Sequence, residues 1–424
     1  MDYDIERRRN MHPVELHCWH FMSYPYLPDD FDEKYDTGWV TVPNKLWDRE
    51  KTDGLYQEYI DQLAYGEELG FDGLVLNEHH QNIYGLMPSP NIIAAALTQR
   101  TSTAKIVVLG NLLPLHLNPL RVAEEYAMID SITSGRLIAG FAVGGGPEAY
   151  NYQVSSPKAR RQFWESIDLI VRAWTDDGPF EHEGKFYPLR YVNIWPKPRQ
   201  TPHPPVWIPG ALSSETMQEV AKRGFDYFLS SRTHGAATRM AREGFAKVLA
   251  EHDDNYHPFR FGVLISVYVA ETDEQAKQES EEGIWYFLRN CLKGHLRRTG
   301  RTLTFGAGVP SQSVNSWKNY LKTSVPGSEM LGDALDWKDL DSKASIIVGS
   351  PDTVREKLWN LIEEAQIGRF LIQFHFGNMK PELARKSMKL FAEHVAPTLR
   401  KDSADLFARQ FPQLESYPVS GTAE

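Results

Sequence analysis

Residues 55–80, LYQEYIDQLAYGEELGFDGLVLNEHH, contain the repeating unit that decides the fold. The first half places Tyr59, Leu63 and other apolar residues at helical spacing, and Gly70 is a typical helix C-terminus. Residues 71–76 then form a short apolar run of the kind that becomes a buried strand. A helix that leads directly into a buried strand is typical of α/β folds with parallel strands.

The same alternation continues along the chain. We predict eight strands, each next to a helix, at residues 14–21, 71–76, 105–110, 137–143, 205–208, 227–229, 261–269 and 370–376. Eight βα units close into a barrel of roughly 250 residues, and a chain of 424 residues leaves room for insertions. The sequence therefore predicts an α/β fold, a (β/α)8 TIM barrel with insertions after strands 1, 4 and 7. An open, doubly wound sheet is the alternative, but no GxGxxG follows the first strand.

Three segments interrupt this alternation. Residues 176–204 have the Gly, Pro and aromatic pattern of a hairpin, whereas residues 23–52 and 283–345 are long and rich in aromatic side chains. Because none of the three is self-contained, we predict a single domain over residues 1–424, with its core at about 14–400.

The two aromatic insertions, 23–52 and 283–345, follow the first and seventh strands, so both emerge at the C-terminal face of the barrel. We predict that they close together over the barrel mouth as a substrate lid. An oligomer interface is the alternative, because exposed aromatic side chains serve that purpose too. The polar tail from Lys401 is expected on the surface or against a neighbouring subunit.

The composition excludes several classes of function. With 42% hydrophobic and 24% charged residues, the chain is typical of a globular protein. A net charge of −10 gives no general attraction for nucleic acid or anionic membranes. Cys18 and Cys291 stand alone, without a CxxC or Cys/His cluster, and no apolar run is long enough for a membrane helix. We therefore expect a cytoplasmic protein with no metal site, no nucleic-acid partner and no membrane partner.

The chemistry of such a barrel lies at the C-terminal ends of its strands. After the second predicted strand stand Asn77, Glu78, His79 and His80. Polar side chains in a row are poor core residues, and histidine exchanges protons near neutral pH. We predict a catalytic role for at least one of these histidines. A loop packed by its own hydrogen bonds is the alternative.

The third and fourth predicted strands end in residues that suit a flat ligand. Gly110 permits a close backbone approach, and the amide of Asn111 offers both a donor and an acceptor, although a simple turn is equally compatible. Gly144, Gly145 and Gly146 leave backbone room for a ligand. Glycine triplets also serve as ordinary linkers.

The residues after the fifth predicted strand suit a phosphate. Gly210 is followed by Ser213 and Ser214 at the start of a predicted helix, where backbone N–H groups and hydroxyls can hold an anion. The alternative is that one serine only caps the helix. A G-x-S-x-G elbow and a GxxxxGK[ST] loop are both absent, which argues against an α/β-hydrolase and a P-loop ATPase.

Several strings, taken in order, resemble the bacterial luciferase-like family of flavin-dependent monooxygenases. The strings are Leu76-Asn-Glu-His-His80, Asn118-Pro-Leu-Arg-Val-Ala-Glu-Glu125, Ser134-Gly-Arg136, Phe141-Ala-Val-Gly-Gly-Gly146, Pro205-Val-Trp-Ile-Pro-Gly210, Val348-Gly-Ser-Pro-Asp-Thr-Val354 and Ser387-Met-Lys-Leu-Phe-Ala-Glu393. Each string is weak alone, whereas their ordered series is specific. The resemblance spans about residues 14–400 and implies a (β/α)8 barrel, in agreement with the strand count.

The resemblance implies FMN as the cofactor, used as FMNH2 that a separate NAD(P)H-dependent flavin reductase supplies, with O2 as co-substrate. His80 matches the family's catalytic histidine and would act on the oxygen adduct of the flavin, with Glu78 or His79 orienting it. The implied cofactor-binding residues are Asn111 at the flavin ring, Gly145, Asn151 and Tyr152 after the fourth strand, and Gly210, Ser213 and Ser214 at the phosphate.

The function expected on this basis is that of a two-component FMN-dependent monooxygenase that oxygenates a small apolar or aromatic organic substrate, as a homodimer or homotetramer. Residues 23–52 and 283–345 depart from shorter relatives, and this leaves the substrate open. Some family members use a deazaflavin and transfer hydride without oxygen. That activity and a non-catalytic flavin-binding barrel are the alternatives.

Overall fold

The computed structural model describes residues 12–35, 37–39, 42–144, 148, 151–152, 154, 156–230, 235–292, 337, 340 and 346–416. Eight of the strands in these ranges are β1 (Glu15–Trp19), β2 (Gly73–Leu76), β3 (Lys105–Leu112), β4 (Leu137–Ala142), β7 (Val206–Gly210), β8 (Asp226–Leu229), β9 (Phe261–Val269) and β11 (Arg369–Gln373). Each pairs in parallel with the next, and β11 pairs back with β1. The predicted (β/α)8 barrel is confirmed, and the open sheet was the wrong alternative.

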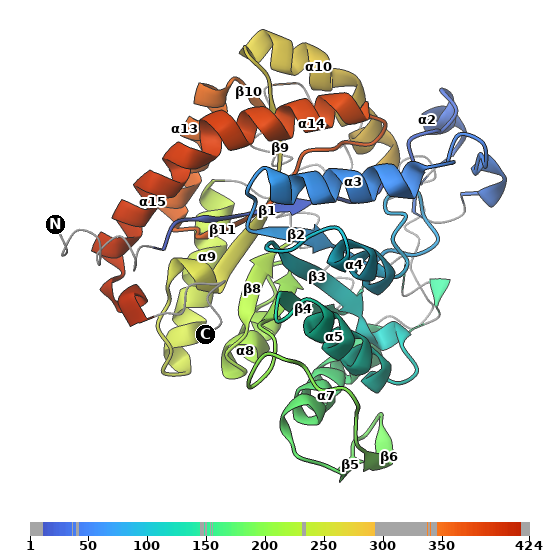
Figure 1. The fold of residues 1–424 in the computed structure, drawn as a ribbon, viewed down its shortest axis with the longest axis vertical. Helices are drawn as coiled ribbons and strands as arrows, with labels where there is room; N and C mark the ends of the chain where they lie inside the picture. Colours follow the sequence, from blue (N-terminus) through green and yellow to red (C-terminus); the bar gives the residue numbers. More distant parts are fainter. Residues whose placement is uncertain are drawn as a thin grey trace.

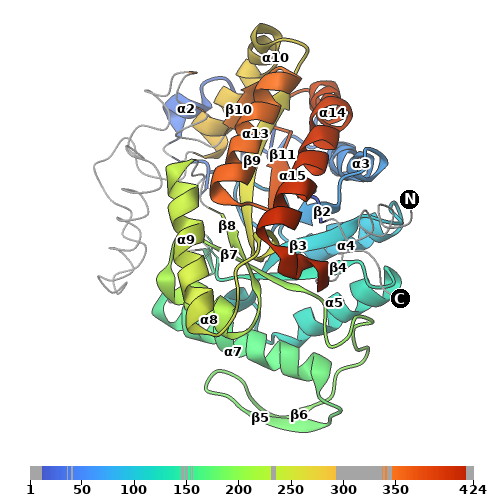
Figure 2. The ribbon, with the colours of Figure 1, turned by 90° about the vertical axis from the view of Figure 1, so that its left-hand side faces the viewer.

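Helices form the outer layer of this barrel (Figures 1 and 2). They are α3 (Leu55–Glu68), α4 (Pro90–Thr98), α5 (Leu120–Ile132), α7 (Ser156–Thr175), α8 (Ser214–Lys222), α9 (Ala236–Glu251), α10 (Asp273–Tyr286), α13 (Pro351–Ala365), α14 (Pro381–Leu390) and α15 (Ala396–Gln410). Helix α3 lies where the apolar spacing before Gly70 predicts it, because its apolar stripe must face the strands.

Two hydrophobic layers hold the barrel together. Strand residues alternate between them, so that Leu16 and Cys18 of β1 face the helices while Trp19 faces the interior. The interior is filled by large rings, among them Trp207, which stacks on Phe228 with 4.1 Å between ring centroids. The barrel is thus a packed core, and ligands must bind at its mouth.

The insertion 176–204 forms the antiparallel hairpin of β5 (Phe180–Glu183) and β6 (Pro188–Val192), as predicted, and projects beyond α7 (Figures 1 and 2). A further short strand, β10 (Ile346–Gly349), pairs with the end of β9 and was not predicted from the sequence. Four residues with no second strand nearby in the sequence give too weak a pattern to be recognised.

The described part of the tail is partly exposed, as expected, and partly buried against its own chain. Helix α15 continues to Gln410, and Leu406 and Phe407 are buried against the rest of the chain. Ser403 also accepts a hydrogen bond from the backbone N–H of Val14 at 2.9 Å, next to β1.

Candidate active site

The polar run after β2 lies at the C-terminal face of the barrel and brings Glu78 and His80 together. His80 donates from Nε2 to Oε1 of Glu78 at 2.7 Å, and its Nδ1 lies 2.9 Å from the hydroxyl of Tyr152. The other carboxylate oxygen, Oε2, accepts the backbone N–H of Leu112 at 2.9 Å. His80 is thereby held in one orientation, with its second nitrogen directed towards Tyr152.

Glu78 is only 4% exposed. Burial by itself would raise its pKa, but the imidazoles of His116 and His80 and the N–H of Leu112 hold that pKa below the ordinary value. Glu78 is therefore ionised near neutral pH. It can stabilise a proton on His80 and fix which ring nitrogen carries it.

A second histidine–carboxylate pair lies beside the first. His79 Nδ1 is 2.9 Å from Oε1 of Glu148, which follows β4 and is 1% exposed. Burial would raise the pKa of Glu148, but the bond to His79 keeps that pKa below its usual range. Among the described residues, the other oxygen of Glu148 has no hydrogen-bond partner. Unpaired buried acceptors are costly, so this atom is a candidate ligand contact.

Aromatic rings surround His79 on its other sides. The ring centroids of Tyr84, Trp39 and Phe21 lie 4.7, 5.6 and 6.5 Å from that of His79. Trp39 also stacks on Tyr84 at 4.4 Å. This wall is apolar apart from the His79–Glu148 pair, and it lies at the end of β1 and β2.

Other buried polar atoms at this face also lack partners within the described ranges. They include Oδ1 of Asn77, whose Nδ2 donates to the carbonyl of His20 at 3.0 Å. Nδ2 of Asn151 is likewise buried and without a partner. Tyr152, by contrast, is exposed and directs its hydroxyl to His80. Gly145 lies outside the described residues.

Asn111 directs its side chain to the surrounding helices, and its predicted contact with the flavin ring stays a prediction. Its Nδ2 donates to Oδ1 of Asn91 at 2.9 Å and to the hydroxyl of Tyr126 at 2.7 Å, both on surrounding helices. Asn91 in turn donates to Oδ1 of Asn111 at 3.4 Å. With all its polar atoms engaged, Asn111 connects β3 to α4 and α5.

The predicted phosphate residues gather at the N-terminus of α8. Ser213 caps this helix, since its Oγ accepts the backbone N–H of Thr216 at 3.4 Å, while Ser214 is exposed in the first turn. Gly210 ends β7 where the ring of Tyr227 occupies the space that a Cβ would need. A side chain at this position would clash with Tyr227, which favours glycine, and the predicted contact of Gly210 with a phosphate stays a prediction.

Sequence reasoning missed Arg160 of α7. Its guanidinium donates to Oγ of Ser213 at 3.2 Å and pairs with Glu215 at 3.0 Å. A cation at a helix N-terminus opposes the helix dipole unless an anion accompanies it. In this structure Glu215 is that anion. Arg160, the serine hydroxyls and the first-turn N–H groups of α8 are the groups that could hold a bound anion in its place, and together they form a candidate anion site. No pattern in the sequence links residues this far apart.

The two aromatic insertions meet in the structure. Trp39 donates from Nε1 to the carbonyl of Cys291 at 2.7 Å, at the end of the π-helical turn η4 (Phe287–Cys291) that follows α10. The hydroxyl of Tyr286 donates to the carbonyl of Tyr24 at 2.8 Å. Most of the segment 283–345, including Trp317, lies outside the described residues.

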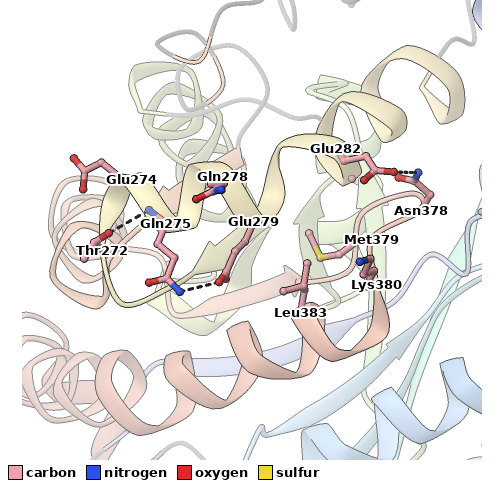
Figure 3. A pocket seen from close by; sticks show the side chains of 11 residues that line it. Thr272, Glu274, Gln275, Gln278, Glu279, Glu282, Asn378, Met379, Lys380 and Leu383 are labelled. Atoms are coloured by element: carbon pink, nitrogen blue, oxygen red, sulfur yellow. Dashed lines mark hydrogen bonds between the residues drawn. The ribbon is translucent and has the colours of Figure 1, made fainter.

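A groove lies elsewhere, on the outer surface between α10 and the start of α14 (Figure 3). It measures about 760 Å³ and is lined mainly by polar side chains of α10. Those side chains bond to one another: Glu279 accepts from Gln275, Tyr268 and Lys386, each at 2.8 Å. Because this groove contains none of the residues at the barrel mouth, it is not the candidate site.

Within the described ranges, no helix is both long and apolar enough to cross a membrane. The same part of the chain contains no group of three or more His, Cys, Asp and Glu side chains arranged to hold a metal ion.

Comparison with known proteins identifies the family. Residues 38–367 match the model of the luciferase-like monooxygenases. The chain is 26% identical over 347 residues to 4-hydroxyprotoasukamycin monooxygenase of Streptomyces nodosus subsp. asukaensis, covering 80% of this chain and 84% of the relative. It is 24% identical over 364 residues to the FMNH2-dependent dimethylsulfone monooxygenase of Pseudomonas putida, covering 85% and 92%.

Solved structures share the fold. One is the oxygenating constituent of 3,6-diketocamphane monooxygenase from Pseudomonas putida in complex with FMN, with a TM-score of 0.68 and 21% identity, covering 91% of this chain and 98% of that chain. Another is an F420-dependent secondary alcohol dehydrogenase, with a TM-score of 0.61 and 13% identity, covering 92% and 99%. The family match over most of the sequence shows that the chain belongs to the luciferase-like monooxygenase family and is a flavin-dependent monooxygenase.

Proposed function

We propose that this chain is the oxygenase of a two-component system that uses FMNH2 and O2 to oxygenate a small apolar or aromatic organic substrate. A separate NAD(P)H-dependent reductase would supply the FMNH2, and the oxygenase would act as a homodimer or homotetramer. The observation that carries the proposal is the pair of contacts His80–Glu78 and His79–Glu148 at the same face of the barrel as the anion site on α8.

The residues present fit FMN at both of its ends. Ser213, Ser214, Arg160 and the N–H groups of α8 suit the phosphate. The unpaired polar atoms of Asn77, Glu148 and Asn151 suit a ring edge that carries both donors and acceptors. When bound, reduced FMN would supply the electrons that activate O2, with one oxygen atom passing to the substrate and the other leaving as water.

In this proposal His80 acts as the acid–base residue of the site. Glu78 fixes an N–H on Nε2, which leaves Nδ1 of the neutral ring free to accept a proton from the site, either from Tyr152 or from a ligand in its place. The charge that then develops on the ring is stabilised by Glu78. His79, held by Glu148, is the second candidate for this role.

The substrate would lie against the aromatic wall of Phe21, Trp39 and Tyr84. Rings that stack on one another favour an apolar or aromatic compound. The contacts of Trp39 and Tyr24 with the end of α10 would close this side of the mouth and exclude water.

The cofactor assignment is tested by replacing Ser213 and Ser214 together with alanine. We expect FMN to bind more weakly by about 1–3 kcal/mol, since bonds to a charged phosphate are lost. Fluorescence titration with FMN and FMNH2 measures this change. Thr272→Ala is the matched control, because Thr272 caps α10 in the same way but lies away from the site. Unchanged affinity in the double variant would reject the assignment.

The activity is tested by supplying the full chain with FMNH2 from a flavin reductase, 18O2 and a panel of aromatic and alicyclic compounds. We expect mass spectrometry to find one 18O atom in the product. The similar fold of the F420-dependent dehydrogenase favours hydride transfer without oxygen as the second candidate. Selective binding of F420 and turnover under argon would support that activity instead, and flavin binding with neither reaction would indicate a non-catalytic barrel.

A further inference from the structure

The carboxylate of Glu78 lies between two imidazoles. Oε1 bonds to Nε2 of His80 at 2.7 Å, and Oε2 faces Nε2 of His116 at 3.9 Å. Because Glu78 is buried, water does not screen these contacts as it would at the surface. The carboxylate carries a single negative charge, so it can neutralise only one imidazolium at a time.

His116 reaches this buried carboxylate from the surface. It follows η2 (Leu113–Leu115) at the end of β3, and its side chain is 28% exposed. Its Nε2 is nevertheless buried and has no hydrogen-bond partner among the described residues. The proposed reaction uses Glu78 and His80 and gives His116 no role, although the partly exposed His116 lies 3.9 Å from the carboxylate of Glu78.

We propose that His116 is a positioning residue that competes with His80 for the charge of Glu78 and so sets the pH range in which His80 can take up a proton. This inference rests on the proposed role of His80. A proton on His116 neutralises Glu78 and repels a second proton on His80.

The other titratable groups that face this pair are His79 and Glu148 from the neighbouring pair, Tyr152 at Nδ1 of His80, and Tyr126, which faces Glu78 from α5. A change at position 116 leaves all of them in place. A change in the titration of His80 can therefore be assigned to His116.

Two substitutions of opposite sign test the proposal. His116→Gln removes the competing charge and should move the titration midpoint of His80 to higher pH by about 0.5–1 unit, the scale of one partly screened charge. His116→Lys makes the charge permanent and should move that midpoint to lower pH. The control is His394→Gln, because His394 is exposed and its one ion-pair contact is with a surface residue.

Two measurements detect the expected shift in the titration midpoint of His80. Long-range 1H–15N NMR of the flavin-free full chain reports the midpoint of His80 directly, with His80→Gln used to assign the signal. The pH profile of oxygenation should shift in the same direction and by a similar amount in each His116 variant. A merely structural role would lower the rate at every pH and leave the profile in place.

The outcomes separate this inference from the proposed function. Opposite shifts of the NMR midpoint support the role of His116 even if no substrate is oxygenated, in which case the proposed function alone fails. Equal midpoints in the wild type and both variants, or the same shift in His394→Gln, would overturn the inference.

Discussion

The two ends of the barrel treat buried charge in opposite ways. At the N-terminal end, Arg369 of β11 donates to Glu15 at 2.6 Å and to Asp226 and the carbonyl of Phe259. At the C-terminal end, Asn77 and Glu148 each bury an oxygen that has no partner among the described residues. The first arrangement stabilises the fold. The second arrangement leaves acceptor oxygens that can bond to a ligand. This is expected of the end where barrel enzymes bind their substrates.

The comparison predicts a change in stability at one end and a change in activity at the other. Arg369→Met should lower the free energy of unfolding by about 3–5 kcal/mol, because it removes the buried guanidinium that both Glu15 and Asp226 contact and leaves those carboxylates to His17 and Arg260. Urea unfolding measures this change. Arg100→Met, which breaks an exposed pair with Asp61, is the control and should cost at most about 1 kcal/mol. Equal losses in the two variants would contradict the assignment of Arg369 as a stabilising residue.

Acid should lower the free energy of unfolding, because the fold keeps a buried histidine neutral near each end of the barrel. Burial lowers the pKa of His375, near the C-terminal end, to about 4; burial together with Arg369 and Arg260 lowers the pKa of His257, near the N-terminal end, to about 3. Because these values lie below the ordinary 6.5, the unfolded chain binds more protons in acid. The stabilisation is complete above about pH 6.5 and is lost as the pH falls towards 4.

For His375 this loss is on the order of 3 kcal/mol. Midpoints of urea unfolding at several pH values between 7 and 4 measure it. His375→Gln should flatten the slope, whereas His394→Gln, at an exposed position, should not. An unchanged slope in His375→Gln would show that other groups cause the acid sensitivity.

At the C-terminal end, His80→Gln should lower oxygenation by about 10²-fold or more, the usual effect of removing an acid–base group. The FMN affinity and the unfolding midpoint should stay near their wild-type values, since His80 is not part of the anion site on α8. Steady-state kinetics, FMN titration and urea unfolding give the three values. A variant that unfolds without a separate catalytic defect would restore the interpretation of this loop as one packed by its own hydrogen bonds.

The smallest effect is expected at the rim of the mouth. Trp39→Ala removes one hydrogen bond to the carbonyl of Cys291, so the release of hydrogen peroxide per NAD(P)H consumed should rise by a factor of about 2–10. Trp195→Ala, on an exposed residue beyond the β5–β6 hairpin, is the control. Light scattering distinguishes the two interpretations of the aromatic insertions, a substrate lid and an oligomer interface. If Trp39→Ala gives a smaller oligomer but leaves the hydrogen peroxide release unchanged, the insertions form a subunit interface instead of a lid.

The sequence by itself determined the order of strands and helices and the face on which the chemistry lies. Burial on both sides requires near-continuous apolar runs such as residues 71–76, and a run of polar residues such as 77–80 marks where the strand leaves the core. These are local properties of the chain. They were sufficient to place His79, His80, Ser213 and Ser214 at strand ends and at a helix start.

Only the tertiary structure decided which of these side chains meet. Alternation along β3 would turn Asn111 inwards like Leu109, but an irregularity between Val108 and Asn111 adds one residue relative to β4 and turns it outwards. Arg160 reaches Ser213, and Glu148 reaches His79, across gaps of 53 and 69 residues. Such pairs depend on how the βα units close around the barrel. The spacing of residues along the chain does not predict which distant units become neighbours.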